Sequence, residues 1–103
     1  MQEIQIEKYI LKQKPTAILL SLKDEQQVWY PSKLARYSAA SYVYTINFLN
    51  KLNKAGLIIF DKQSKKKIVK LSDKGKVIVG FLDELINRLN QKPIVQQPSQ
   101  QPS

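Results

Sequence analysis

One stretch of the chain, SYVYTINFLNKLNK from Ser41, carries side chains with a clear capacity for polar chemistry. A helix turns by about 100° per residue, so a helix here with Leu49 at the centre of its buried face has a distinct outer face. That outer face carries an aromatic, an amide and two cations: Tyr44, Asn47, Lys51 and Lys54. An Asn amide can pair with the N6/N7 edge of adenine, a tyrosine hydroxyl can donate to a phosphate, and lysines suit phosphates. The pattern therefore favours contact with a nucleic acid.

Two other aromatic residues of this stretch are expected to lie in the core. Tyr42 falls within about 60° of the buried centre, and Phe48 lies at the flank of the same face. The alternative for the outer residues is an ordinary solvated helix face whose lysines complement the helix dipole.

The composition restricts the function further. The chain has 103 residues, with 17 Lys and Arg against 8 Asp and Glu, and a net charge of +9. Such an excess favours a polyanionic partner, DNA or RNA or less often an anionic membrane surface, although it can also serve solvation alone. The absence of Cys and His excludes thiol chemistry, zinc fingers and histidine bases.

Catalysis and membrane insertion are not expected. The acidic pairs Asp24/Glu25 and Asp83/Glu84 are sequence neighbours, which diverge on a helix, and the three glycines are isolated. We therefore expect no enzyme, cofactor or metal. The longest apolar runs are far shorter than the roughly 18 residues of a membrane span, and the N-terminus does not resemble a signal peptide. A cytoplasmic, nucleoid-associated protein is the expectation.

The pattern of apolar residues and turn signals predicts one α+β, mainly α-helical domain over residues 1–91. The order is helix, short strand, short helix, longer helix, β-hairpin and helix, which is a winged helix-turn-helix. The predicted elements are helices over 2–13 and 16–23, a short strand at 28–30, a short helix from Pro31, a helix over 42–54 that Gly56 ends, strands in LIIFDK and KIVKLS, and a helix over 73–91. Residues 92–103, rich in Pro, Gln and Ser, are predicted to be a disordered tail.

Further cations surround the predicted helix over 42–54. The hairpin between the two strands is predicted to form a basic wing that contacts the DNA backbone, carrying Lys62, Lys65, Lys66 and Lys67. A charged turn that only prevents aggregation is the alternative. Lys33 and Arg36 of the short helix could contact a phosphate. Ser38 or Ser41 can cap the next helix by accepting from a free backbone N–H. Ser41 is also a candidate DNA contact.

The last predicted helix has more apolar residues than one face needs. Val77, Ile78 and Phe81 are expected to close the core. The residues beyond them predict a twofold dimer in which the N-terminal segment packs alongside. The predicted interface consists of Ile6, Tyr9, Ile10, Leu82, Leu85, Ile86 and Leu89. The alternative is an N-terminal helix that folds back and covers the stripe within one chain.

The segment KLARYSAASYVYTINFLNKLNKAGLI, followed by IVKLSDKG, resembles winged-helix DNA-binding proteins of the MarR/PadR-like kind. The matching positions are Leu34, Ala35, Ser41, Leu49, Leu52, Gly56, Leu57, Ile58, Leu71, Ser72, Lys74 and Gly75. In size and charge the chain is also similar to small basic winged-helix proteins of thermophilic archaea. It is shorter than ordinary MarR proteins, whose long paired terminal helices build an effector pocket.

The resemblance implies a double-stranded DNA-binding homodimer, either a transcriptional regulator or a small chromosomal protein. Two alternatives remain. One is a winged-helix module that docks a protein or RNA, and the other is an effector-sensing MarR-like repressor.

Overall fold

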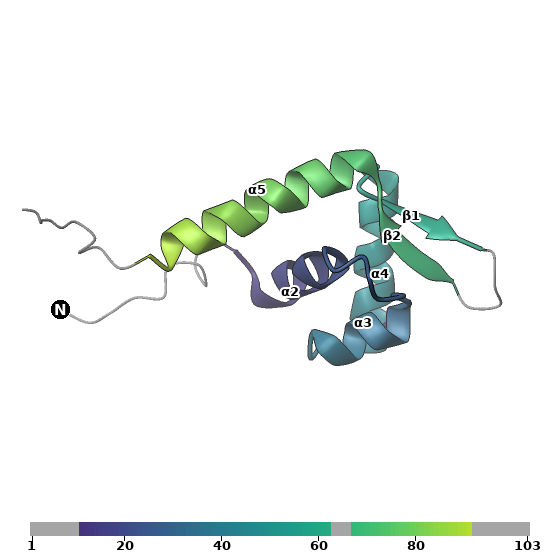
Figure 1. Cartoon of the computed structure of the whole chain (residues 1–103). Coiled ribbons are helices and arrows are strands. Elements are labelled where there is room, and N and C mark those ends of the chain that lie inside the picture. The colour runs from purple at the N-terminus through teal and green to yellow at the C-terminus, as the bar shows by residue number, and fades with distance from the viewer. Residues whose placement is uncertain (1–10, 63–66, 92–103) are drawn as a thin grey trace, which may run out of the picture.

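The computed structural model describes residues 11–62 and 67–91. Within them the chain is mainly helical with one β-hairpin (Figure 1). Its elements are α2 (Gln13–Leu22), α3 (Pro31–Tyr37), α4 (Tyr42–Lys54), β1 (Ile58–Asp61), β2 (Ile68–Leu71) and α5 (Asp73–Leu89). The α+β architecture of a winged helix-turn-helix is confirmed. None of the described helices is long and apolar enough to cross a bilayer.

The predicted helix over 2–13 lies mostly outside the described residues, and its predicted end is wrong. Leu11 and Lys12 are not helical, and Gln13 already begins α2. The reason is Pro15, which has no N–H and is tolerated only in the first turn of a helix. Starting α2 at Gln13 places Pro15 in that first turn.

The core lies where α2, α3, α4 and the hairpin meet. It contains Ile18, Leu22, Trp29, Leu34, Leu49, Leu52, Ile58, Val69, Leu71 and Val79, all of them buried. Phe48 is partly buried against this cluster, as its flanking position predicts.

The hairpin pairs β1 with β2 in an antiparallel register, with Ile58 opposite Leu71 and Asp61 opposite Ile68. Trp29 adds an isolated bridge to Val69, whose N–H donates to the Trp29 carbonyl oxygen at 2.8 Å. The short strand predicted over 28–30 is therefore confirmed only as this one bridge. It fastens the loop before α3 to the base of the wing.

The end of α4 and the start of α5 meet in a close, hydrogen-bonded junction. Gly56 ends α4 in the left-handed region, with φ of 79°. The carbonyl groups at this helix end are then satisfied from α5. Ser72 donates through its Oγ to Gly56 O at 2.6 Å and through its N–H to Leu57 O at 3.0 Å. Lys74 Nζ donates to Ala55 O at 3.1 Å.

Gly75 allows the first turn of α5 to lie directly on this junction. A methyl group at Gly75 would lie 1.9 Å from the Leu57 carbonyl oxygen. Ser72 also caps α5, since its Oγ accepts from the Gly75 N–H at 3.0 Å, as predicted. Asp73 occupies the first turn, where it complements the helix dipole.

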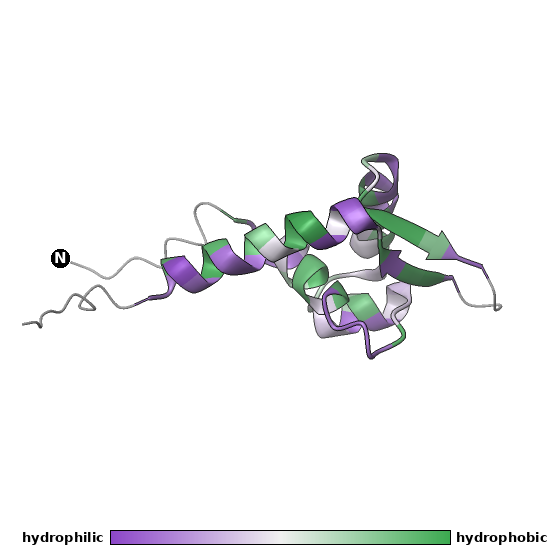
Figure 2. Cartoon of the chain, turned by 45° about the horizontal axis from the view of Figure 1, so that its top comes forward, coloured by the Kyte–Doolittle hydropathy of each residue, from purple (hydrophilic) through white to green (hydrophobic). Residues whose placement is uncertain are grey.

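This contact fixes the rotation of α5 and corrects a prediction about its faces. Because Gly75 must face the junction, the residue one turn later, Val79, enters the core. Val77, Ile78 and Phe81, which were predicted to close the core, are instead 58%, 42% and 65% exposed. Figure 2 shows apolar, green bands along α5 out towards its C-terminal part.

We expect Gly75→Ala to lower the free energy of unfolding by about 1–3 kcal/mol, because the added methyl group overpacks against backbone that cannot move aside. Gly80→Ala is the matched control. A methyl group at Gly80 has no neighbour within 4 Å, so the better helix propensity of alanine should raise stability by about 0.5–1 kcal/mol. Urea unfolding of both variants measures the two changes, and equal effects would contradict the contact at Gly75.

Candidate nucleic-acid interface

The turn between α3 and α4 has the geometry of a helix-turn-helix. Ala39 lies in the left-handed region, with φ of 52°, and the Ala40 N–H donates back to Ala35 O at 2.9 Å. Ser41 then caps α4, because its Oγ accepts from the Tyr44 N–H at 3.0 Å. The hydroxyl of Thr45 donates to Ser41 O at 2.9 Å. The start of α4 is thus held by two side-chain hydrogen bonds.

The two faces of α4 divide largely as the helical periodicity predicts. Thr45, Leu49 and Leu52 are buried. Tyr44, Asn47, Lys51 and Lys54 are exposed, together with Val43, of which 68% is exposed. The Tyr44 ring stacks on Phe48, with centroids 6.2 Å apart. We call the exposed residues Val43, Tyr44, Asn47, Lys51 and Lys54 the outer face of α4.

Tyr42 is a correction, since 55% of it is exposed and it does not belong to the core. It is the first residue of α4, and the turn before it holds it beyond the layer that Thr45 and Leu49 fill. Tyr42 instead lines an open hollow of about 530 Å³ between α3, α4 and the wing. The residues around this hollow are Tyr30, Pro31, Ser32, Arg36, Tyr42, Ile46 and Lys67.

Sequence reasoning missed Tyr30, Ser32 and Tyr42 as members of this surface. They come from the start of α3 and the start of α4, which the packing of these helices brings together beside the wing. The hollow places the cations Arg36 and Lys67 on one concave surface beside the start of α4.

The two predicted cations of α3 have different surroundings. Lys33 is half-buried, with its Nζ 4.8 Å from the Trp29 ring centroid and 5.9 Å from that of Tyr37. The same Nζ donates to Val28 O at 3.1 Å. Arg36 is exposed and forms no ion pair within the described part of the chain. Arg36 is therefore the cation of α3 that is free to meet a phosphate.

The base of the wing faces the C-terminal half of α4. Lys67 Nζ lies 4.4 Å from the Phe60 ring centroid, and Lys62 is exposed. A second hollow, of about 460 Å³, is lined by Asn50, Asn53, Ile59, Phe60, Lys62 and Lys67. Lys65 and Lys66 of the predicted wing tip lie outside the described residues.

Charges are distributed unevenly between α3 and α4 and the rest of the molecule. From Val28 to Phe60 the chain has no Asp or Glu, so α3 and α4 carry cations without any acid. The ion pairs within residues 11–62 and 67–91 lie elsewhere: Lys23–Asp83, Lys70–Asp61 at 3.3 Å, Lys76–Glu25 at 3.5 Å and Arg88–Glu84 at 3.2 Å. Within the described residues, acids thus pair with Lys70 of the hairpin and with Lys76 and Arg88 of α5, whereas Lys51 and Lys54 of α4 form no ion pair.

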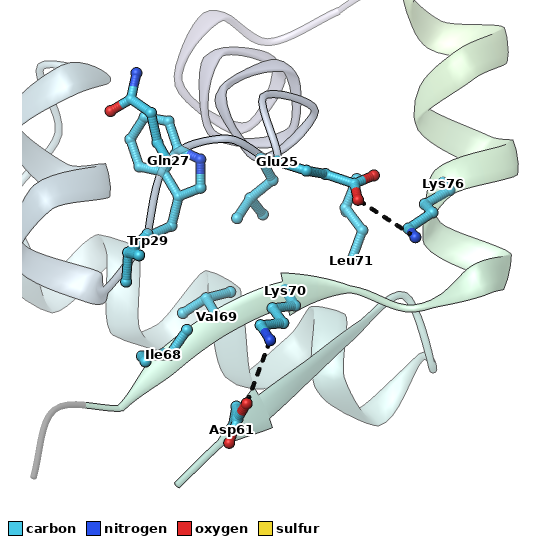
Figure 3. Close-up of a pocket in the computed structure, with 11 residues that line it drawn as sticks. Glu25, Gln27, Trp29, Asp61, Ile68, Val69, Lys70, Leu71 and Lys76 are labelled. Carbon is cyan, nitrogen blue, oxygen red and sulfur yellow. Dashed lines mark ion pairs between the residues drawn. The ribbon is translucent and has the colours of Figure 1, made fainter. Parts of the chain in front are cut away.

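Two of these ion pairs line a cavity of about 470 Å³ behind the wing (Figure 3). Its wall combines Trp29 and apolar residues of β2 with the pairs Lys70–Asp61 and Lys76–Glu25. This volume lies within the usual range of small-molecule sites. We call it the rear cavity.

Several solved structures share this architecture. AF1382 from Archaeoglobus fulgidus superposes with a TM-score of 0.78 at 21% identity, covering 84% of this chain and 99% of that chain. MepR, a transcription regulator of the Staphylococcus aureus multidrug efflux pump MepA, superposes with a TM-score of 0.75 at 16% identity. The match covers 93% of this chain and 73% of MepR. NMB1585, a MarR family regulator from Neisseria meningitidis, superposes with a TM-score of 0.70 at 18% identity. The match covers 87% of this chain and 65% of NMB1585.

These likenesses show that the chain has the winged-helix fold found in MarR-family regulators. The predicted resemblance in fold is therefore confirmed. No protein-family model and no curated protein matches the sequence.

Proposed function

We propose that the protein binds double-stranded DNA as a homodimer, with α4 in the major groove and the wing on the backbone. The observation that carries the proposal is the charge segregation, which leaves an exposed, acid-free surface on α3 and α4 beside the wing. Helix-turn-helix proteins place the second helix of the motif in the major groove. The structural neighbours include a transcription regulator and a MarR family regulator, which supports the same role.

The contacts divide by chemistry. Arg36, Lys51 and Lys54 contact phosphates, and the wing lysines Lys62 and Lys67 follow the DNA backbone. Tyr44 and Asn47 face the bases. Ser41 contributes by fixing the start of α4, since its hydroxyl is already engaged as the cap. In this proposal the protein is not an enzyme, and it lies in the cytoplasm in association with the nucleoid.

Binding to duplex DNA should weaken steeply with salt, because each lysine or arginine on a phosphate releases a counterion. Fluorescence anisotropy across a salt series measures this slope. Arg36→Gln should reduce the slope by about one for each protomer. Arg88→Gln, which removes the same charge from a residue paired with Glu84, should leave it unchanged. An affinity that does not change with salt concentration, or no binding at low salt, would contradict the proposal.

The dimer is proposed to form through α5. Its outer side carries Phe81 and Leu85, which are 65% and 41% exposed and lie one turn apart. The half-buried Leu82, Ile86 and Leu89 continue this surface. A twofold dimer through α5 would place two α4 helices about one DNA turn, ~34 Å, apart. The predicted partners Ile6, Tyr9 and Ile10 lie outside the described residues and remain part of the proposal.

Phe81→Glu should raise the dissociation constant of the dimer by about 100-fold or more, because the interface would then bury an unpaired carboxylate. Analytical ultracentrifugation measures this constant. Asn87→Glu is the control, since it adds the same charge at an exposed polar position of α5 and should change self-association little. A Phe81→Glu variant that self-associates like the wild type would exclude α5 as the interface.

Small-molecule sensing is a second candidate, and the rear cavity is the observation that favours it. Trp29 is the only tryptophan of the chain and lines this cavity. A bound effector should therefore change its fluorescence, which titration with a library of small organic acids and amines measures. A library that leaves both the fluorescence and the DNA affinity unchanged would argue against sensing.

A further inference from the structure

We infer that the outer face of α4 selects A·T base pairs and reads thymine methyl groups in particular. This inference rests on the proposed binding of duplex DNA through α4. It concerns which duplexes the protein prefers and does not concern the phosphate contacts that hold it there.

The N-terminal part of the helix lacks the charged side chains that read G·C pairs. Residues 37–50 contain no charged residue, so the first two turns of α4 have neither an Arg or Lys for guanine nor an Asp or Glu for cytosine. The small hydroxyl groups both take part in holding the start of the helix. Ser41 Oγ accepts from the Tyr44 N–H, and Thr45 is buried with its hydroxyl on Ser41 O.

The same turns expose apolar surface where bases are met. Val43, the second residue of α4, is 68% exposed, and Tyr42 beside it is 55% exposed. The N-terminal residues of a recognition helix are those that reach base edges. In the major groove, the thymine C5-methyl is the apolar group that an exposed valine can cover.

Asn47 completes the pattern. It lies four residues after Val43, on the same exposed face and about 6 Å further along the helix axis. An Asn amide pairs through two hydrogen bonds with adenine N6 and N7. Val43 and Asn47 can thus meet a thymine and an adenine of neighbouring base pairs.

Three duplexes of equal length test the inference at one salt concentration: an A·T-rich duplex, the same duplex with deoxyuridine in place of thymidine, and a G·C-rich duplex. Uracil keeps the base pairing and removes only the methyl group. We expect the thymine duplex to bind more tightly than the uracil duplex, by about fourfold for each methyl group that is fully covered. The G·C-rich duplex should bind most weakly.

Val43→Ala should abolish the difference between the thymine and uracil duplexes while retaining the salt dependence. Val28→Ala is the matched control, because Val28 is 57% exposed outside the helix-turn-helix, and it should keep the difference. Equal binding to the thymine and uracil duplexes, preference for the G·C-rich duplex, or a difference that survives Val43→Ala would overturn the inference. Salt-dependent binding to all three duplexes would still support the proposed function, whereas binding to none would overturn both.

Discussion

The contact between the first turn of α5 and the end of α4 sets the arrangement of the remaining elements. Gly75 lies so close to the Leu57 carbonyl that no side chain fits between them. Ser72 and Lys74 meanwhile bind the carbonyl groups of Gly56 and Ala55. Three elements leave this point: α4, the hairpin and α5. Their relative angles therefore depend on a few backbone hydrogen-bond acceptors that would otherwise be unsatisfied at a helix end.

This junction has consequences at both ends of the molecule. On one side it holds the wing beside α4, so that Lys67 and Arg36 share one hollow. On the other side it fixes the rotation of α5, which turns Val79 inward and Phe81 outward. The surface proposed to bind DNA and the surface proposed to form the dimer thus depend on the same contact. A dimer built through α5 would fix the spacing of its two α4 helices through this junction.

Much of the fold could be predicted because local signals agree with the packing. Pro31, Ser41, Gly56 and Ser72 mark the helix ends that the structure shows. The buried face of α4 followed from its periodicity, because Thr45, Leu49 and Leu52 recur at helical spacing. The sequence offers Ser38 or Ser41 as the cap of that helix, and the structure shows that the cap is Ser41.

The sequence-based predictions are wrong where a residue distant in the chain decides which face of a helix is buried. Apolar residues occur on several faces of α5, so its sequence alone does not decide whether Val79 or Phe81 is the buried residue. The contact between Gly75 and Leu57 decides this, and those residues are far apart in the chain. Tyr42 was misplaced for a related reason, since the turn at Ala39 carries it past the core. The contact of Lys33 with the rings of Trp29 and Tyr37 likewise depends on how the loop before α3 packs, and no local sequence pattern predicts it.

The central claim is that the acid-free surface of α3 and α4, together with the adjoining wing lysines, is the one that meets a duplex. Amide chemical-shift mapping of the labelled protein during titration with a short duplex tests it most directly. The account predicts perturbations along the outer face of α4, at Arg36 and at Lys67, with little change along the rear cavity. Perturbations that centre on Glu25, Lys70 and Lys76, and leave the outer face of α4 unchanged, would contradict it.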